Sequence, residues 1–539
     1  MVLRDGVCLP DLDACGLSAV WTDGGCLPVG VPASGCAEGF EHDGAGGCAP
    51  VLPPERCGVG TMAIPGDASC RPIVGCKEGR WGDAPTSAGT IFVDAASTTP
   101  SPDGSLDRPW PTIQRAIDAA PVGATIAIGP GKYAETVRVN KRVALHGACP
   151  STVEIAGATG EFASVDITQP AELHEIAVTG SGFGVVVTNA REVLLDRLWV
   201  HDTKTGGVYV ANGGKGASAT LVGSLVERAT GAGVSSGSGE LLVDRSVVRD
   251  TRADTRRDWG YGVRSELFGP PDKPLETPAS VTVRRSLIEH NLTGGMLAQG
   301  SSLVLEGTVV RDVGTRPKDG LGGEGVIGLF FRLAPMVRVT QSWVGNTHTA
   351  GVVAYGGTLE VDRTSIEDVE PNSKGELGFG VLSRPSGEDP PLSAPTSSIT
   401  ATRVRRVRTV GILAIGGEAT LVGALVLDVT PRADGAFGDG VGVGAFVAKD
   451  GTIVDATASV TRVLVRRASR AGFVIAGATV SIATSQLSCN GIDLDAESTV
   501  GGGIGHPFSL TDDGHTWCGC GLGGSCRAQS TGLEPVAAP

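Results

Sequence analysis

A glycine followed by an apolar residue recurs along most of the chain at intervals of 23 to 33 residues. The stretches between these glycines alternate apolar and polar residues, which is the period of a β-strand, and about three short strands fit in each interval. A repeat of this length without helical segments is typical of a parallel β-helix, in which the strands of each coil pair with those of the neighbouring coils. The recurring glycines are Gly184, Gly207, Gly233, Gly262, Gly295, Gly325, Gly351, Gly380, Gly411, Gly442 and Gly472.

One amphipathic helix precedes the repeat. Within residues 112–120 the apolar positions follow the i, i+3, i+4, i+7 spacing of one helix face, and Pro121 ends the pattern. A stack of coils has open ends whose unpaired backbone groups would recruit other chains. We therefore expect the helix at 112–120 to cap the first coil, with the cysteine-rich region before it adding to that cover. We expect the tail at 491–539 to close the other end.

The helix and the strands after it carry a family resemblance. The stretch TIQRAIDAAPVGATIAIGPGKYAETVRVNKRVALHG, residues 112–147, resembles the opening segment of proteins of the pectin lyase-like superfamily, including pectin methylesterases and uncharacterised secreted bacterial β-helix proteins. The resemblance implies an all-β fold, a single-stranded right-handed parallel β-helix of about 12 to 14 coils over residues 89–490. It does not imply one activity, because this scaffold carries lyases, hydrolases, esterases, epimerases and non-catalytic proteins. The Gln-Asp-Thr and Asp-Phe-Ile-Phe-Gly stretches of pectin methylesterases are absent from the sequence.

The cysteines indicate an oxidising compartment. Eight of the 13 lie between Cys8 and Cys76, separated by 5 to 12 residues in a Gly- and Pro-rich stretch, without the short spacing of zinc sites. This pattern predicts a disulfide-stapled region over residues 1–88. Four more cysteines near the end predict two disulfides that fasten the tail. Cys149 stands alone, and the odd total leaves one free thiol or a partner upstream.

Charge and hydropathy exclude two classes of partner. The formal net charge is -14, from 44 Lys and Arg against 58 Asp and Glu, whereas a nucleic-acid surface needs clustered positive charge. No apolar run approaches the roughly 18 residues of a membrane span. The first ten residues lack the basic start and apolar centre of an export signal. An extracellular or cell-surface location is therefore expected from the cysteines alone.

A column of charged residues accompanies the repeat. Reading the fifth residue of each Ser/Thr-x-apolar-x-x signal gives acidic side chains that alternate with basic or amide ones. With adjacent coils about 4.8 Å apart, each carboxylate would have a donor in the coils above and below, and successive Asp residues would lie about 10 Å apart. The pattern predicts a structural ladder of Asp202, Arg228, Asp250, His290, Asp312, Asn346, Asp368, Arg406, Asp428 and Arg467. A longer loop follows each Asp from Asp250 onward.

The ladder also holds the candidate catalytic residues. Asp250, His290 and Asp312 are the one place where an imidazole lies between carboxylates, and Lys318 in the next long loop is a candidate base. A histidine in a repeat is also a common hydrogen-bonded spacer. The loop after Asp250 supplies the candidate binding residues Trp259, Tyr261, Arg256 and Arg257. No compact acidic cluster predicts a metal site, so no cofactor is expected, except calcium if the protein is a lyase.

Two functions remain open from the sequence. Glycosidases place two carboxylates about 5 to 9.5 Å apart, which the predicted 10 Å spacing with a cation between does not match. The balance favours a secreted or cell-surface rod that is structural or binds glycan or another envelope component without catalysis. The alternative is a polysaccharide lyase or glycoside hydrolase acting on acidic polysaccharide. The sequence leaves the ligand and the oligomeric state open.

Overall fold

The computed structural model describes residues 2–4, 7–256, 258–267, 277–387 and 392–534. The chain forms two compact units. The amino-terminal unit is Val51–Leu297 with Ser301–Leu303. The carboxy-terminal unit is Met1–Pro50, Ala298–Gly300 and Val304–Pro539.

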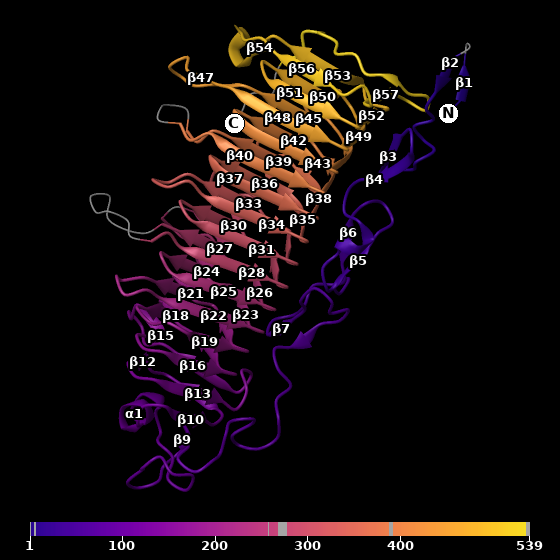
Figure 1. Ribbon diagram of the computed structural model, residues 1–539. Coiled ribbons are helices and arrows are strands. Elements are labelled where there is room, and N and C mark those ends of the chain that lie inside the picture. The colour runs from indigo at the N-terminus through magenta and orange to yellow at the C-terminus, as the bar shows by residue number, and fades with distance from the viewer. Residues whose placement is uncertain (1, 5–6, 257, 268–276, 388–391, 535–539) are drawn as a thin grey trace. The chain divides into compact units, whose positions relative to one another are not determined.

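The described residues form a right-handed parallel β-helix, as predicted (Figure 1). Three long parallel sheets contain 16, 16 and 14 strands among these residues, and each coil supplies one strand to each sheet. We call them sheet 1, sheet 2 and sheet 3 in the order in which the chain visits them. The 14 strands of sheet 3 agree with the upper end of the predicted 12 to 14 coils, and the two larger sheets gain strands at their ends.

In the amino-terminal unit, sheet 1 contains β9 (Ile91–Val93), β10 (Ala124–Ile128), β13 (Val143–Gly147), β16 (Ala171–His174), β19 (Val193–Asp196), β22 (Ser218–Val222), β25 (Glu240–Asp244) and β28 (Ser280–Arg284). Sheet 2 contains β11 (Gly131–Tyr133), β14 (Val153–Ala156), β17 (Ala177–Thr179), β20 (Trp199–His201), β23 (Leu225–Glu227), β26 (Val247–Arg249) and β29 (Leu287–Glu289). Sheet 3 contains β12 (Val137–Val139), β15 (Ala163–Ile167), β18 (Phe183–Thr188), β21 (Gly206–Ala211), β24 (Ala232–Gly237), β27 (Tyr261–Glu266) and β30 (Gly294–Gln299).

In the carboxy-terminal unit, sheet 1 contains β31 (Ser302–Glu306), β34 (Met336–Thr340), β37 (Gly357–Asp362), β40 (Pro395–Thr400), β43 (Gly417–Val422), β48 (Ala456–Thr461), β51 (Thr479–Ala483) and β56 (Ser509–Asp512). Sheet 2 contains β32 (Val309–Arg311), β35 (Trp343–His348), β38 (Ser365–Glu370), β41 (Arg403–Val407), β44 (Leu425–Val429), β49 (Leu464–Ala468), β52 (Gln486–Ser488), β57 (Trp517–Gly519) and β58 (Gly524–Ser525). Sheet 3 contains β33 (Glu324–Leu329), β36 (Ala350–Tyr355), β39 (Phe379–Arg384), β42 (Val410–Ile415), β45 (Asp439–Gly444), β50 (Ala471–Ala476) and β53 (Ile492–Glu497).

Short elements complete the described structure. The hairpins are β1 (Val2–Arg4) with β2 (Val7–Leu9), β3 (Ala19–Thr22) with β4 (Gly25–Pro28), β5 (Phe40–His42) with β6 (Cys48–Pro50), β7 (Thr61–Met62) with β8 (Arg71–Pro72), β46 (Phe446–Val447) with β47 (Ile453–Val454), and β54 (Thr499–Val500) with β55 (Ile504–Gly505). Two 3₁₀ turns are η1 (Ala33–Gly35) and η2 (Gly501–Gly503).

The predicted helix is α1 (Ile113–Ala119), and it packs against β9, β10 and β12 at the first coil (Figure 1). Ile113, Ala116 and Ile117 are buried on its apolar face. The Glu135 carboxylate accepts hydrogen bonds from the backbone N–H groups of Ile113 and Gln114, at 2.7 and 3.0 Å. It thereby satisfies two of the donors that a helix leaves unpaired at its first turn.

The recurring glycines form a column in each unit, with one correction. A Cβ on Gly351 would lie 2.8 Å from the carbonyl oxygen of Gly380 and 2.5 Å from a methyl of Ile366, so the space between coils excludes a side chain. Gly440 continues this column, because a Cβ there would lie 2.5 Å from the carbonyl oxygen of Gly472. The predicted Gly442 lies two residues further along β45, where a Cβ would meet only the side chain of Leu413 closely, at 2.8 Å.

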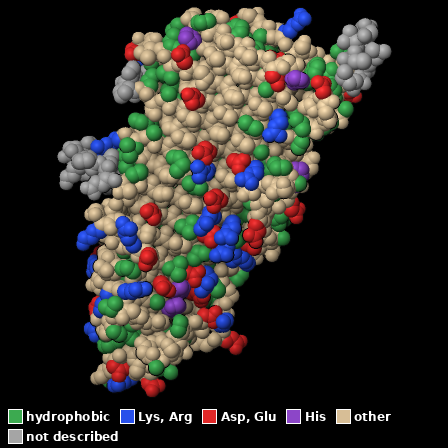
Figure 2. Space-filling view, viewed as in Figure 1, with side chains coloured by type: hydrophobic (Ala, Val, Ile, Leu, Met, Phe, Trp, Pro, Cys, Tyr) green, Lys and Arg blue, Asp and Glu red, His purple; other side chains and the backbone are tan. Residues whose placement is uncertain are grey.

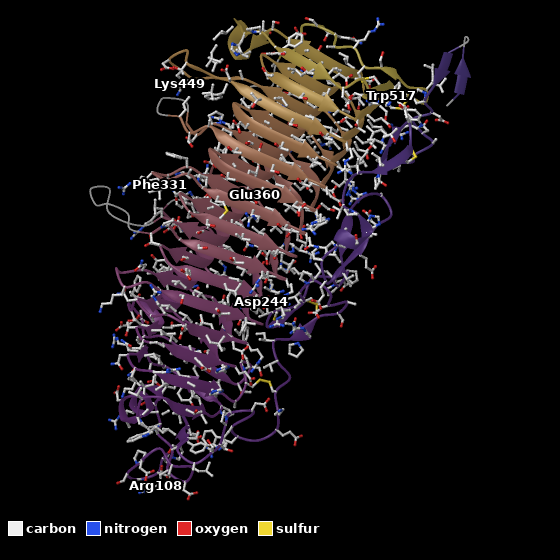
Figure 3. All side chains as sticks on the ribbon, viewed as in Figure 1. Arg108, Asp244, Phe331, Glu360, Lys449 and Trp517 are labelled. Atoms are coloured by element: carbon white, nitrogen blue, oxygen red, sulfur yellow. A yellow bond between two sulfur atoms is a disulfide. The ribbon has the colours of Figure 1, made fainter. Side chains whose placement is uncertain are left out.

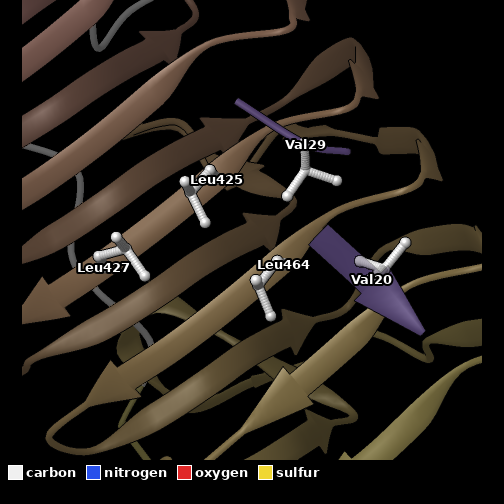
Figure 4. Packing of buried hydrophobic residues seen from close by; sticks show 5 residues of the cluster. All are labelled: Val20, Val29, Leu425, Leu427 and Leu464. Atoms are coloured by element: carbon white, nitrogen blue, oxygen red, sulfur yellow. The ribbon is translucent and has the colours of Figure 1, made fainter. Parts of the chain in front are cut away.

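The cysteine-rich region covers the first coil only in part. Trp81 and Ala84 pack against Phe92 of β9 and Ala127 of β10, as expected, whereas the segment before them lies elsewhere. Residues 9–76 form an extended arm on the outer face of sheet 2 (Figure 1). In the carboxy-terminal unit, Val20 and Val29 of the arm pack against Leu425, Leu427 and Leu464 of sheet 2 (Figure 4). The outward side chains of these strands are apolar, so they need a cover, and the arm supplies it.

Six disulfides join twelve of the cysteines. Cys15–Cys26, Cys36–Cys48 and Cys57–Cys70 close loops of the arm. Cys149 is not alone, as the sequence suggested, but joins Cys76 at the end of the arm. The side chain of Cys8 lies outside the described part of the chain.

The tail adds strands to the stack and is fastened as predicted. β56 and β57 pair in parallel with β51 and β52, so the coils continue past the boundary at 490 that the sequence indicated. Cys489–Cys520 and Cys518–Cys526 are the two tail disulfides. Among the described residues, no helix is long and apolar enough to cross a bilayer.

Candidate functional site

All ten ladder residues lie in or directly after a strand of sheet 2, before the chain enters sheet 3. Each has a left-handed backbone, with φ between 50° and 61°. Asp, Asn and His tolerate this conformation better than most residues, which accounts for their recurrence here. The shared backbone geometry gives the side chains a common direction within each unit.

The ladder consists of pairs. In the amino-terminal unit, the Arg228 guanidinium donates two hydrogen bonds to the Asp202 carboxylate, with Nη2 at 2.7 Å from Oδ2. In the carboxy-terminal unit the pairs are Asp312 with Asn346 at 3.1 Å, Asp368 with Arg406 at 2.6 Å and Asp428 with Arg467 at 2.5 Å. Each of these bonds joins an Asp to the donor of the next coil, which is one of the two sides on which the sequence predicted a donor.

A cavity of about 590 Å³ lies beside this column in the amino-terminal unit. Its walls come from arm residues 56–59 and from the coils between residues 227 and 292. Four arginines line it against two carboxylates, in a chain whose net charge is -14. Figure 2 shows blue Lys and Arg side chains beside red Asp and Glu side chains on the visible face of the amino-terminal coils. The charged lining residues are Arg56, Glu227, Arg228, Arg249, Asp250 and Arg252.

Glu227 and Arg249 form the buried wall of the cavity. Both side chains are 1% exposed, and Arg249 Nη2 lies 2.7 Å from Glu227 Oε2. Arg249 also donates to the backbone carbonyls of Cys57, Gly58 and Thr61 in the arm, at 2.8 to 3.0 Å. Burial raises the pKa of Glu227, but the hydrogen bonds and charges of Arg249 and Arg228 outweigh it and lower the pKa overall. The Glu227 carboxylate is therefore ionised, and both of its oxygens are paired with arginines.

Asp202 anchors two other arginines of the lining, Arg228 and Arg252. Its carboxylate accepts from Arg228 and, at 3.2 Å, from Arg252 Nη2. The hydrogen bonds from Arg228 hold the pKa of Asp202 well below its usual range. The Arg252 side chain is 47% exposed, so much of its guanidinium faces solvent. Arg228 and Arg252, both paired with Asp202, therefore place positive charge beside the cavity.

The structure brings two of the predicted catalytic residues to this cavity. Asp250 and His290 both line it, and the arm residue Arg56 forms an ion pair with the Asp250 carboxylate. The other two candidates, Asp312 and Lys318, belong to the carboxy-terminal unit. Lys318 is exposed in the long loop before β33.

The predicted binding residues of the loop before β27 lie away from the cavity lining. Tyr261 is only 7% exposed, and the Arg264 guanidinium lies 5.3 Å from the Trp259 ring and 5.8 Å from the Tyr261 ring. Tyr261 is therefore packed and does not offer an open face to a sugar. Arg256 is exposed, and Arg257 lies outside the described residues.

Sequence reasoning missed Arg56, Glu227, Arg249 and Arg252. A signal for two of them was present, because the residues just before three successive ladder positions alternate in charge. In sheet 2 of the amino-terminal unit this column reads Glu227, Arg249 and Glu289. Arg56 had no such signal, since its place depends on how the arm docks.

Comparisons with known proteins locate the chain among β-helix structures. No protein-family model matches it, and no curated protein matches it significantly in sequence. The A-module of mannuronan C-5 epimerase AlgE6 from Azotobacter vinelandii is 16% identical, with a TM-score of 0.41 over 75% of this chain and 94% of that one. The catalytic unit of a GH87 α-1,3-glucanase from Streptomyces thermodiastaticus is 15% identical, with a TM-score of 0.36 over 80% and 69%. Pectate lyase Pel9A is 12% identical, with a TM-score of 0.36 over 62% and 78%. The likeness concerns the fold alone.

Proposed function

We propose that this is an extracellular or cell-surface protein that binds acidic polysaccharide, without catalysis, in the arginine-lined cavity. The observation that carries the proposal is the convergence of four arginines on one cavity of a strongly acidic chain. Guanidinium groups bind carboxylates in a planar, two-pronged geometry, which suits the uronate groups of an acidic glycan. The six disulfides support an oxidising, extracellular compartment.

The engagement of the carboxylates argues for binding over catalysis. A retaining glycosidase needs two carboxylates about 5.5 Å apart, one of them free to attack the sugar. Here Glu227 is held by Arg249, and Asp250 is held by Arg56. A lyase would need a Lys or Arg as base, and each of the four arginines that line the cavity is paired with a carboxylate. The cavity is lined by four arginines and two carboxylates, so the net charge of its lining is positive, which favours binding of an anion.

The test is calorimetric titration of the full chain with oligogalacturonate, with a neutral gluco-oligosaccharide as a second ligand. We expect binding of the acidic ligand only, weakened at least tenfold by the double change Arg56→Gln and Arg252→Gln. The matched control is Arg338→Gln with Arg408→Gln, two exposed arginines that also pair with carboxylates. An equal loss in the control would mean that only net charge matters, and the proposal would be wrong.

The same samples decide the enzymatic alternative. Unsaturated products and reducing ends are followed with and without calcium. Turnover that disappears on changing His290→Ala would assign the protein to the lyases or hydrolases acting on acidic polysaccharide.

A further inference from the structure

A second cavity lies on the outer face of sheet 1 in the amino-terminal unit. It is an open trough of about 720 Å³ across β19, β22, β25 and β28. Its floor is a row of four half-buried side chains in cross-strand register: Leu194, Thr220, Leu242 and Thr282. Apolar and hydroxyl side chains alternate along this row. None of these residues lines the arginine-lined cavity.

One end of the trough opens into a smaller cavity of about 330 Å³. The two cavities share Ser218, Glu240 and Ser280. Arg191 and Lys215 line the smaller cavity. Within the described chain, neither of these two cations has a hydrogen-bond or ion-pair partner, although most arginines of this protein are paired.

The loop that carries Lys215 is held by two asparagine side chains. Asn189 Oδ1 accepts the backbone N–H of Gly213 at 2.7 Å, and Asn212 Oδ1 accepts that of Gly216 at 2.9 Å. Gly216 has φ +80°, and a Cβ there would collide with the Arg191 guanidinium. The Arg191 guanidinium therefore lies against the loop that carries Lys215, so the two cations are close to one another.

The opposite end of the trough holds a third cation, Arg284. Its buried Nε has no hydrogen-bond partner among the residues that the structure describes. The neighbouring carboxylate, Asp244, is engaged by Arg285 at 2.9 Å (Asp244 is labelled in Figure 3). A buried guanidinium nitrogen without an acceptor is unfavourable unless a ligand supplies one.

We infer that this trough is a second binding site, for an oligosaccharide that carries anionic groups. Threonine hydroxyls and leucine methyls match the hydroxyl edges and the C–H faces of pyranose rings, and the cations at both ends match carboxylate or sulfate substituents. The volume lies within the usual range of ligand sites. Four coils of about 4.8 Å spacing and four residue steps of about 3.3 Å give room for a short oligosaccharide.

Two other ligand classes fit less well. A peptide that binds a sheet usually adds a strand to an open edge, but β22 and β25 are paired on both sides. Nucleic acid requires a run of positive charge, and the trough is also lined by Glu192 and Glu240. The inference shares its ligand class with the proposed function but rests on different residues.

The test is the stoichiometry of oligogalacturonate binding to the full chain, measured by calorimetry, with an oligosaccharide of chondroitin sulfate as a parallel probe. We expect two sites per chain, and one site after the double change Arg191→Gln and Lys215→Gln. The change Arg284→Gln is expected to weaken the same site at least fivefold. The matched control, Arg115→Gln with Arg142→Gln, removes two exposed arginines elsewhere in the unit and should leave two sites.

The outcomes separate this inference from the proposed function. If one site is lost with Arg56→Gln and Arg252→Gln but the Arg191 and Lys215 variant still binds as wild type, the trough is not a site and the first cavity remains one. If only the Arg191 and Lys215 variant loses binding, the trough stands and the proposed function fails. No binding of either probe by the wild type contradicts both. Preference for the sulfated probe would identify sulfate esters as the anionic groups.

Discussion

The glycine column makes a quantitative prediction at Gly440 and Gly442, two glycines on the same strand. At Gly440 a new methyl would lie 2.5 Å from the carbonyl oxygen of Gly472, and real Cβ contacts essentially never fall below 3.0 Å. The Gly472 carbonyl oxygen belongs to the backbone and cannot rotate away as a side chain could. The two adjacent coils must therefore separate by at least half an ångström. Overpacking of this kind costs about 1 to 3 kcal/mol, and a backbone obstacle favours the upper part of that range.

At Gly442 the only close neighbour is the Leu413 methyl at 2.8 Å, which lies at the end of a flexible side chain. Replacing glycine by alanine in extended backbone restricts the unfolded chain, which stabilises the fold by about 0.4 to 1 kcal/mol. The net expectation is about 2 kcal/mol of destabilisation for Gly440→Ala and about zero for Gly442→Ala. A gap of 2 kcal/mol corresponds to a roughly 30-fold difference in the folding equilibrium.

Urea titration of both variants, followed by circular dichroism, measures this gap, provided the dependence on urea has the same slope for both. The comparison is internally controlled because the two substitutions are chemically identical and lie on one strand. If the free energies of unfolding of the two variants differ by less than about 0.5 kcal/mol, or if Gly440→Ala is the more stable variant, then the space between coils does not require glycine. The assignment of the column to Gly440 would then be wrong.

Three further predictions concern the arm and the charged groups. Replacing the buried Arg249 by Met leaves Glu227 with only one of its two arginine partners, Arg228, and should destabilise the amino-terminal unit by about 3 kcal/mol, measured by thermal unfolding; a loss below 1 kcal/mol would contradict the buried pair. Burial, together with the charge of His174, lowers the pKa of His146 from 6.5 to about 4, so its contribution is intact above pH 6.5 and is lost as pH falls toward 4. His146→Phe should therefore reduce the loss of stability between pH 6.5 and 4.5 by about 1 kcal/mol in urea titrations, once the shift is discounted for the partial exposure of the ring, and an unchanged pH profile would refute this. Changing Cys76 to Ser should speed proteolysis of the arm in limited trypsin digestion, because its link to the first coils is lost; an unchanged cleavage pattern would show that packing alone holds that end.

The sequence predicted the β-helix because its period is local. Each coil repeats the same spacing of glycine, strand and corner, so the fold follows from residues about thirty positions apart. The error at Gly442 has a local cause, because Gly440 and Gly442 are both followed by Val and lie on one strand. Only the pairing of Val410 with Asp439 decides that Gly440 faces Gly411. The period of the repeat alone therefore does not decide which of two glycines, two residues apart on one strand, pairs with the glycine of the neighbouring coil.

The arm could not be placed from the sequence for a different reason. Its contacts join residues far apart in the sequence, by 192 positions in the hydrogen bond from Arg249 to the Cys57 carbonyl. A partial signal was present in the outward apolar residues of sheet 2, such as Leu425 and Leu464, which an uncovered sheet would expose. That signal indicates that a cover exists but does not identify which segment provides it.

The buried charges couple the arm to the candidate site. Arg249 has five donor groups, and Glu227 satisfies only part of them, so the guanidinium needs further acceptors inside the structure. The arm supplies three backbone carbonyls, and the segment that provides them also forms one wall of the cavity. Without the arm, Arg249 would gain water, the wall would be absent and Arg56 would no longer face Asp250. Binding in this cavity therefore depends on the docked arm, whereas the trough on sheet 1, which the arm does not line, should bind with or without it.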